Sequence, residues 1–146
     1  MHAALPRFAG LVVLACCLAA CITREPSPQE VRSKQFEAVA GMSVVYLYRD
    51  RVDFTSSPAS FTLDEQHQGA TYRGTYFRLE MAPGKHRIAG FAADIGHLDF
   101  ITEAGRIYFI RHSVTRLHNF DLSVFQIVPA EYGRPAVLQY EMNGAP

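Results

Sequence analysis

The chain has 146 residues, with 14 lysines and arginines against 14 aspartates and glutamates, so its formal net charge is zero. A neutral chain has no basic field to attract nucleic acid and no polybasic patch for an anionic membrane. All three cysteines lie within the first 21 residues, so the rest of the chain cannot form a disulfide and must fold by packing alone.

The N-terminal segment has the parts of a bacterial secretory signal. Arg7 supplies a positive charge, and residues 8–18 form an apolar stretch that is shorter than the about 20 residues of a membrane-spanning helix. The tetrapeptide LAAC at 18–21 resembles the lipobox of bacterial lipoproteins. This resemblance implies cleavage between Ala20 and Cys21 and covalent lipid on the Cys21 sulfur. An ordinary cleaved signal and a signal anchor are the alternatives.

Lipid on Cys21 predicts where the protein is located. A thiolate is the strong nucleophile that accepts the lipid, and two or three acyl chains make a durable membrane anchor. We therefore expect an exported protein, lipid-anchored to a membrane and facing the periplasm. Ile22 stands where aspartate would favour retention in the inner membrane, so the general sorting pattern favours the outer membrane.

The sequence divides into a signal peptide at residues 1–20, a tether at 21–41 and one β-sandwich domain at 42–146. Removal of the signal leaves 126 residues with 13 basic and 14 acidic side chains. Within the tether, Ser27 and Glu30 fit a helix capping box, with Pro28 at the first helical position. A short helix could therefore run to about Ala40, and a solvated linker is the alternative.

From Met42 onward the apolar pattern has a period of two, which is typical of strands. Strands of about seven residues, spaced about ten residues apart, predict an antiparallel β-sandwich of about seven strands. The predicted strands are 43–49, 59–65, 75–81, 86–93, 97–103, 106–114 and 120–128, with a turn at 66–70 and a type II turn at 82–85 around Gly84. The segment 133–142 predicts a closing helix with Pro135 at its first position.

Two segments are apolar on both faces, at 44–48 and 107–110. A half-exposed strand would alternate with polar residues. We expect these strands to be central and covered on both sides, with the C-terminal segment as one cover. The alternative is an apolar patch that contacts a partner.

Three motifs link the chain to a family. They are a tyrosine-rich strand ending in arginine, then Y-F-x-x-x-x-x-P-G-x-H, then G-x-x-Y-F-x-R. The matching residues are Tyr46, Tyr48 and Arg49, then Tyr76, Phe77, Pro83, Gly84 and His86, then Gly105, Tyr108, Phe109 and Arg111. From Met42 to Met142 the sequence resembles the domain of unknown function 2846. That resemblance implies a sandwich similar to PEGA and prealbumin-like modules, and it carries over no catalytic residue.

Candidate chemistry is sparse. Asp94, His97 and Asp99 are the best candidates for a metal or acid–base site, because His97 and Asp99 share one face of a strand. We favour instead a solvent-facing strand, with Leu98 and Phe100 pointing inward. We expect His112 and His118 at the surface and His86 near turn carbonyls. No nucleophile elbow, phosphate loop or dinucleotide fingerprint occurs, and no cofactor is expected.

The tyrosines at 46, 48, 76 and 108 fit core packing better than a platform for glycans, and the chain has no tryptophan. The sequence therefore predicts a non-catalytic binding or scaffolding module in the cell envelope. Its partner would be an envelope protein or peptidoglycan, and the binding residues are not identified. A small metal- or histidine-dependent hydrolase and a structural lipoprotein contacting peptidoglycan are the alternatives.

Overall fold

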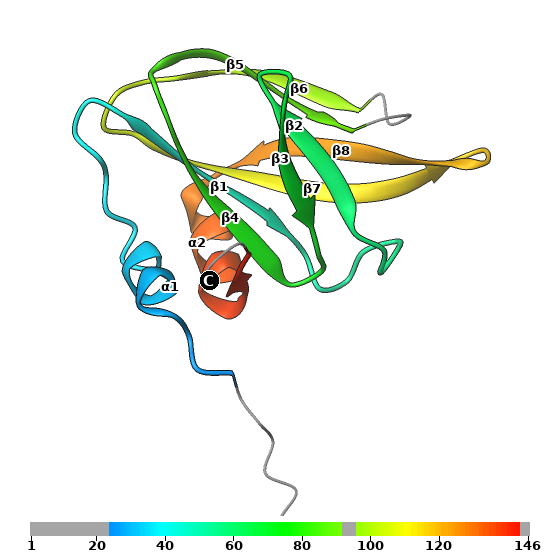
Figure 1. Ribbon diagram of the computed structural model, residues 1–146, viewed down its shortest axis with the longest axis horizontal. Helices are drawn as coiled ribbons and strands as arrows, with labels where there is room; N and C mark the ends of the chain where they lie inside the picture. Colours follow the sequence, from blue (N-terminus) through cyan, green and yellow to red (C-terminus); the bar gives the residue numbers. More distant parts are fainter. Residues whose placement is uncertain (1–23, 92–95, 144–146) are drawn as a thin grey trace, which may run out of the picture.

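The computed structural model describes residues 24–91 and 96–143, which form two packed β-sheets with two short helices on one side (Figure 1). The predicted mainly β sandwich is confirmed, with nine strands rather than about seven. In chain order the elements are α1 (Pro28–Ser33), β1 (Ser43–Arg49), β2 (Ala59–Leu63), β3 (Gln66–Thr71), β4 (Thr75–Met81), β5 (Gly84–Gly90), β6 (His97–Thr102), β7 (Ile107–Leu117), β8 (Phe120–Val128), α2 (Ala130–Gln139) and β9 (Glu141–Met142).

The five-stranded sheet has the order β8-β7-β1-β4-β9 and is mixed, not purely antiparallel as predicted. β1 pairs antiparallel with β4 and parallel with β7, and β9 pairs parallel with β4. The chain leaves this sheet after β1 and again after β4 to build the other sheet. It returns each time by a crossover, and such connections allow parallel neighbours.

The four-stranded sheet has the order β3-β2-β5-β6 and is antiparallel throughout. The segment 66–70, predicted as a turn, belongs to strand β3. The turn is instead formed by Asp64 and Glu65, whose φ angles are 49° and 68°. Two adjacent residues at positive φ are typical of a tight hairpin turn between antiparallel strands. The polar start of β3 lies at the exposed edge of its sheet, where pairing does not require apolar side chains.

The link from β4 to β5 crosses between the sheets and is not the predicted type II turn. Gly84 has a φ of 146° and is the first residue of β5. A type II turn would place this residue near +80°. Proline and glycine at 83–84 therefore mark the crossing between two layers.

Strand β1 is buried along its whole length, which confirms that it is covered on both faces. Val45 and Leu47 pack between the sheets with Phe61 and Ile88. The alternate residues of β1, with Phe109 of β7, face the helices and form a second apolar cluster. The alternation of strand side chains thus divides the core into two layers.

Helix α1 begins as predicted, because the Ser27 hydroxyl accepts a hydrogen bond from the Glu30 N–H at 3.1 Å. It ends at Ser33, well before Ala40. The Tyr46 hydroxyl donates to the Ser33 carbonyl at 2.5 Å, and the Phe36 ring lies 5.2 Å from the Tyr46 ring. Ser33 and Phe36 of the predicted tether therefore pack onto the sheet.

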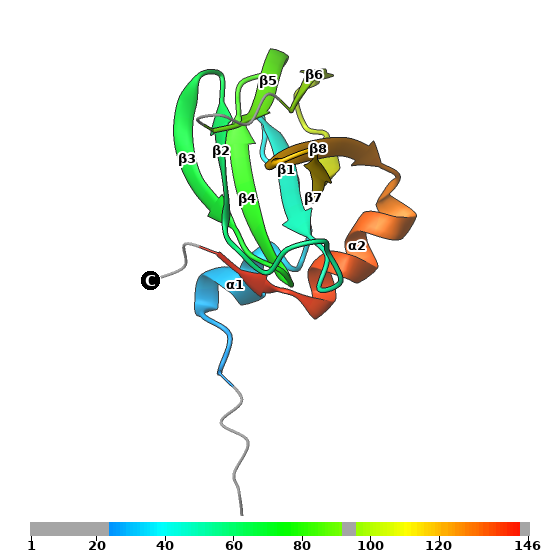
Figure 2. The same ribbon diagram turned by 90° about the vertical axis from the view of Figure 1, so that its right-hand side faces the viewer.

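Helix α2 covers the same side of the five-stranded sheet, over β1 and β7 (Figure 2). It begins at Ala130, so Pro135 lies within the helix and not at its first position. Gly133 allows α2 to lie close to β7, because a β-carbon at this position would collide with the Phe109 side chain. No helix in the described ranges is long and apolar enough to cross a membrane.

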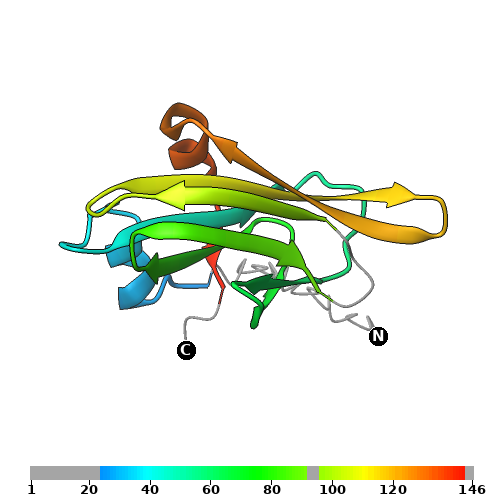
Figure 3. The same ribbon diagram turned by 90° about the horizontal axis from the view of Figure 1, so that it is seen from above.

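The β7–β8 hairpin projects beyond the rest of the sandwich (Figure 3). β1 pairs with β7 only as far as His112, whereas β7 and β8 remain paired to Leu117 and Phe120. Among the described residues, the outer part of this hairpin therefore has no paired strand on the β1 side.

Candidate functional site

Of the residues predicted to carry chemistry, Ala20, Cys21 and Asp94 lie outside the described residues. His97 and Asp99 are exposed on one face of β6, and Leu98 and Phe100 face inward as expected. The Asp99 carboxylate accepts two hydrogen bonds from the Arg87 guanidinium, at 2.6 and 2.9 Å. Within residues 24–91 and 96–143 there is no group of three histidines, cysteines or acidic residues that could hold a metal ion.

His86 lies near a turn carbonyl, as predicted, but its second partner was not foreseen. Nε2 is 2.8 Å from the Ala82 carbonyl, and Nδ1 is 2.7 Å from an Asp64 carboxylate oxygen. Both ring nitrogens are therefore engaged with acceptor atoms of the protein, and we interpret this pair as structural.

Asp64 also receives the Arg87 backbone N–H at 2.9 Å. Partial burial alone would raise the pKa of Asp64, but the hydrogen bonds from His86 and from the Arg87 N–H outweigh it and lower that pKa below its ordinary value. The pair borders a cleft of about 660 Å³ that has charged walls and an apolar side at Phe100 and Ile101.

The Asp64 contacts predict a pH-dependent stability. A lowered carboxyl pKa stabilises the fold above the ordinary value of about 4, and this contribution is lost as the pH falls through the lowered value. Asp64→Asn should therefore lower the urea midpoint at neutral pH and leave it nearly unchanged at low pH. Asparagine tolerates the positive φ of this position, so the turn should remain intact. Parallel curves for both proteins across the acid range would contradict the prediction.

His112 was predicted at the surface, and this prediction is wrong: the side chain is fully buried. Nδ1 lies 2.8 Å from the Thr71 hydroxyl of β3, and Nε2 lies 2.8 Å from the Ser123 hydroxyl of β8. The ring stacks on Phe125 at 4.3 Å. The imidazole therefore bridges the two sheets. The Ser123–His112 spacing is that of a nucleophile and its base, but Ser123 is only 1% exposed, so no substrate can reach it.

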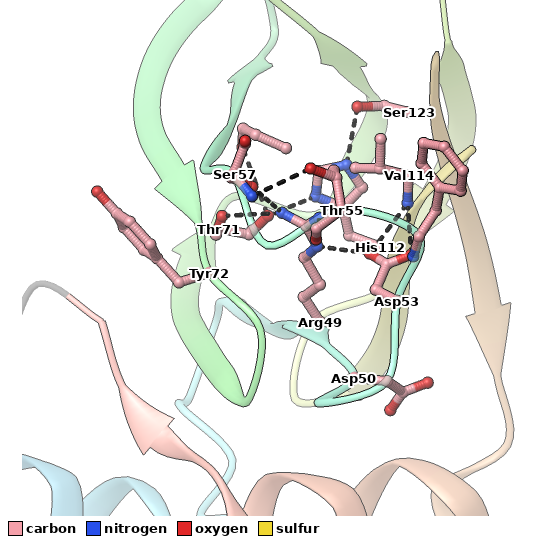
Figure 4. A network of polar contacts seen from close by, with 12 residues as sticks. Arg49, Asp50, Asp53, Thr55, Ser57, Thr71, Tyr72, His112, Val114 and Ser123 are labelled. Atoms are coloured by element: carbon pink, nitrogen blue, oxygen red, sulfur yellow. Dashed lines mark hydrogen bonds and ion pairs between the residues drawn. The ribbon is translucent and has the colours of Figure 1, made fainter. Parts of the chain in front are cut away.

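A second buried polar network surrounds Arg49, at the end of β1 (Figure 4). Its guanidinium pairs with the Asp53 carboxylate at 2.5 Å and donates to the carbonyls of Thr55, Ser57 and Thr71. Asp53 in turn accepts the Val114 N–H from the free side of β7. The two charged side chains are 0% and 6% exposed. They hold the loop at 50–58 and shield the part of β7 that β1 does not reach.

Three of the four mid-strand tyrosines are buried, which supports core packing over a platform for glycans. The exception is Tyr108, which is partly buried. Burial raises the pKa of Tyr76 to about 12, even though the hydrogen bond to Ser33 acts in the other direction. The Tyr46 and Tyr76 hydroxyls both bond to Ser33, so these phenols attach α1 to the sheet.

The feature that sequence reasoning did not single out is the edge formed by β8. β8 is the outermost strand of its sheet and carries exposed apolar side chains at Phe120, Val124 and Ile127. Edge strands are usually protected by charged side chains, proline or a bulge. The stretch FDLSVFQIV contains no lysine, arginine or proline, and its pairing with β7 is regular. Its one charged residue, Asp121, lies near the hairpin turn and pairs with Arg116 of β7 at 2.6 Å, so residues 122–128 carry no charge. The lack of lysine, arginine and proline in the predicted strand 120–128 was the sequence feature that could have indicated this edge.

Comparison with known families gives one match. The family described as "Protein of unknown function (DUF2846)" matches residues 39–122, which is more than half of the chain. The match covers the three motifs noted in the sequence and confirms the resemblance. Among curated proteins, no match to the chain is found.

Proposed function

We propose that this chain, which belongs to the DUF2846 family, is a lipid-anchored envelope protein whose sandwich serves as a non-catalytic binding or scaffolding module. The anchor would confine the module to a membrane surface facing the periplasm, and Ile22 after the cysteine favours the outer membrane. Confinement of this kind raises the effective concentration of a module for partners on the same surface. The observation that carries the binding role is the unprotected edge strand β8.

The sequence around Cys21 supports the anchor. A short apolar segment precedes the LAAC tetrapeptide, and no cysteine follows it in the chain. A protein exported to an oxidising compartment benefits from having no spare thiol. If Cys21 carries lipid, the mature chain has none.

Cys21→Ser should abolish lipidation and processing, because a hydroxyl cannot replace the thiolate as acceptor of the lipid. We expect the variant to accumulate at precursor size and to lose labelling by a fatty-acid probe in growing cells. Cys17→Ser is the matched control and should be processed and labelled like the wild type. A Cys21→Ser protein that still runs at mature size and carries label would contradict the anchor.

The edge of β8 supports a particular way of binding. One row of its backbone N–H and C=O groups faces β7, and no strand of the described part of the chain pairs with the opposite row. An extended segment of a partner can add to such an edge as a further strand. Val124 and Phe120 flank the edge on the helix side and Ile127 on the sandwich side, and these would contact alternate side chains of the segment.

We therefore assign the binding site to β8 and its partner to the class of extended, alternately apolar protein segments. The three other edge strands fit this role less well. β3 begins with three exposed polar residues, and its pairing with β2 has a register shift. In β6 the central aspartate, Asp99, forms an ion pair with Arg87. β9 has only two residues.

Val124→Lys tests this assignment. A lysine on an edge strand opposes pairing, and we expect peptide affinity to fall by about tenfold or more, which corresponds to roughly 1.4 kcal/mol. The probe is a set of extended peptides tiled across envelope proteins, and the readout is the backbone amide shifts of β8. Ile101→Lys, an exposed change on β6, is the control and should bind like the wild type. Binding that shifts β6 or no strand at all would contradict the role of β8.

A further inference from the structure

Several segments meet at the end of the sandwich where the described chain begins. Arg24 lies 3.5 Å from the Glu141 carboxylate, and the Glu141 N–H donates to the Gly74 carbonyl. On the same end, Arg51 donates to the Gln139 carbonyl at 2.8 Å. The β3–β4 turn, the C-terminal end of α2 and the loop after β1 are therefore neighbours, and the Arg24 side chain reaches this region at Glu141. We call the region formed by these segments the exit end (Figures 1 and 2).

The exit end exposes apolar side chains on neighbouring loops. Val52 is 91% exposed and Phe54 is 58% exposed, and both belong to the loop at 50–58. Tyr72 of the β3–β4 turn and Leu138 of α2 are also exposed. Single exposed apolar residues are ordinary, but a group on adjacent segments at one end marks an interaction surface.

The loop that carries Val52 and Phe54 is held from inside. Its polar residue Asp53 turns inward to Arg49, while the side chains of Val52 and Phe54 on either side are exposed. The Phe54 ring also lies 5.2 Å from the Arg116 guanidinium of β7, which holds one face of the ring and leaves more than half of the side chain exposed. Arg49 also binds the carbonyls of Thr55 and Ser57 (Figure 4). This is the reverse of the usual preference, in which apolar side chains are buried and charges are exposed. A loop fixed in this way presents its two apolar side chains without the entropy cost of ordering them on contact.

The position of the chain start indicates what the surface contacts. Arg24 is three residues from Cys21, and three residues span at most about 10 Å. If Cys21 carries lipid, as in the function proposed above, the exit end cannot lie far from the bilayer. Residues 28–33 offer no extra length, because α1 is attached to the sheet through Ser33.

We propose that the exit end is a membrane-facing surface that places Val52 and Phe54 in the interfacial region of a phospholipid bilayer. Arg24, Arg51 and Arg73 are exposed on the same segments and would lie at the level of the lipid phosphates. Aromatic and aliphatic tips beside arginines are the composition that favours the membrane interface. The surface orients the domain, so that the cleft beside Asp64 and His86, at the other end of β2 and β3, faces away from the membrane.

The chain has no tryptophan, so a single introduced tryptophan reports on one position. The test uses the full-length protein, purified from the membrane fraction and reconstituted in phosphatidylethanolamine vesicles with a minority of phosphatidylglycerol. Phe54→Trp places the reporter at the exit end. Ile101→Trp is the matched control, because Ile101 is 64% exposed but lies far from the exit end. The exit end is at the Thr75 end of β4, whereas Ile101 lies near the other end of that strand, about 20 Å away.

We expect the Phe54→Trp emission to shift to the blue and to lose most of its intensity when the vesicles contain lipids brominated near the headgroup. The Ile101→Trp emission should change in neither respect. Equal quenching of both reporters, or quenching of neither, would overturn the proposal. So would a photoreactive residue at position 54 that crosslinks to protein in cells and not to lipid.

Lipidation is read separately, by the mass of the N-terminal peptide in the same preparations. An unmodified Cys21 together with selective quenching at position 54 would refute the anchor and support the surface. A lipidated Cys21 together with an unquenched Phe54→Trp would support the anchor and refute the surface.

Discussion

Replacing Arg49 with leucine is expected to lower the free energy of unfolding by about 3–5 kcal/mol, because it leaves the Asp53 carboxylate buried without its counter-charge. Both side chains are almost completely buried, and the guanidinium also satisfies three backbone carbonyls of the loop at 50–58 and of β3. Leucine offers no donor to any of these groups. The measurement is the urea midpoint and slope of the purified domain, followed by circular dichroism.

Arg87→Leu is the matched control for this substitution. Arg87 also forms an ion pair with an aspartate, with two hydrogen bonds, but both side chains are more than half exposed. Exposed ion pairs of this kind contribute about 0–1 kcal/mol. Similar small losses in both variants would show that the Arg49 network does not hold the fold. A large loss confined to Arg49→Leu would show that burial determines the effect.

The second large effect is expected at Gly133, in the middle of α2. Glycine to alanine inside a helix ordinarily stabilises it by about 1 kcal/mol. Here a β-carbon would lie 2.3–2.6 Å from three atoms of the Phe109 side chain, so the helix or the ring must move. Phe109 is buried among Tyr46, Phe36 and Val137 and has little room to move. We expect Gly133→Ala to destabilise the domain by roughly 1–3 kcal/mol, the usual cost of overpacking a core.

Leu138→Ala is a suitable control for Gly133→Ala, because Leu138 is exposed on the same helix and its replacement should change the stability little. Chemical shifts of the β7 amides distinguish a displaced helix from a locally adjusted ring. A rise in the unfolding midpoint of Gly133→Ala would contradict the prediction. It would mean that α2 packs less closely on β7 than the contact at Phe109 indicates.

The two proposed surfaces lie on different segments of the domain, which allows both to act at once. The binding edge is the strand β8, and the membrane-facing surface is formed by the loop at 50–58, the β3–β4 turn and the end of α2. Asp53 connects them, because its carboxylate accepts the Val114 N–H of the projecting hairpin. The Arg49 network therefore holds the loop of one surface and supports the hairpin of the other.

The predicted candidates for chemistry show where sequence reasoning is weak. Residues at 97 and 99 were placed on one exposed face correctly, because the alternation of a strand is local. The sequence could not show that Arg87 forms an ion pair with Asp99, since β5 and β6 become neighbours only when the strands pair. The surface position predicted for His112 was wrong for a similar reason. The hydroxyls that make its burial possible come from residues 41 positions before it and 11 positions after it.

Patterns among residues close in the chain predicted most strands, the mainly β class, the complete burial of β1 and the capping of α1 by Ser27. These features depend on alternation and capping among residues close in the chain. The tertiary structure alone decided that β1 runs parallel to β7 and that α1 packs against Tyr46 and Tyr76. It also decided that Arg49 is buried while Val52 is exposed. Each of these depends on which distant segments meet, because a charge can be buried only where remote partners neutralise it, and strand direction follows from the path that the chain takes between two sheets.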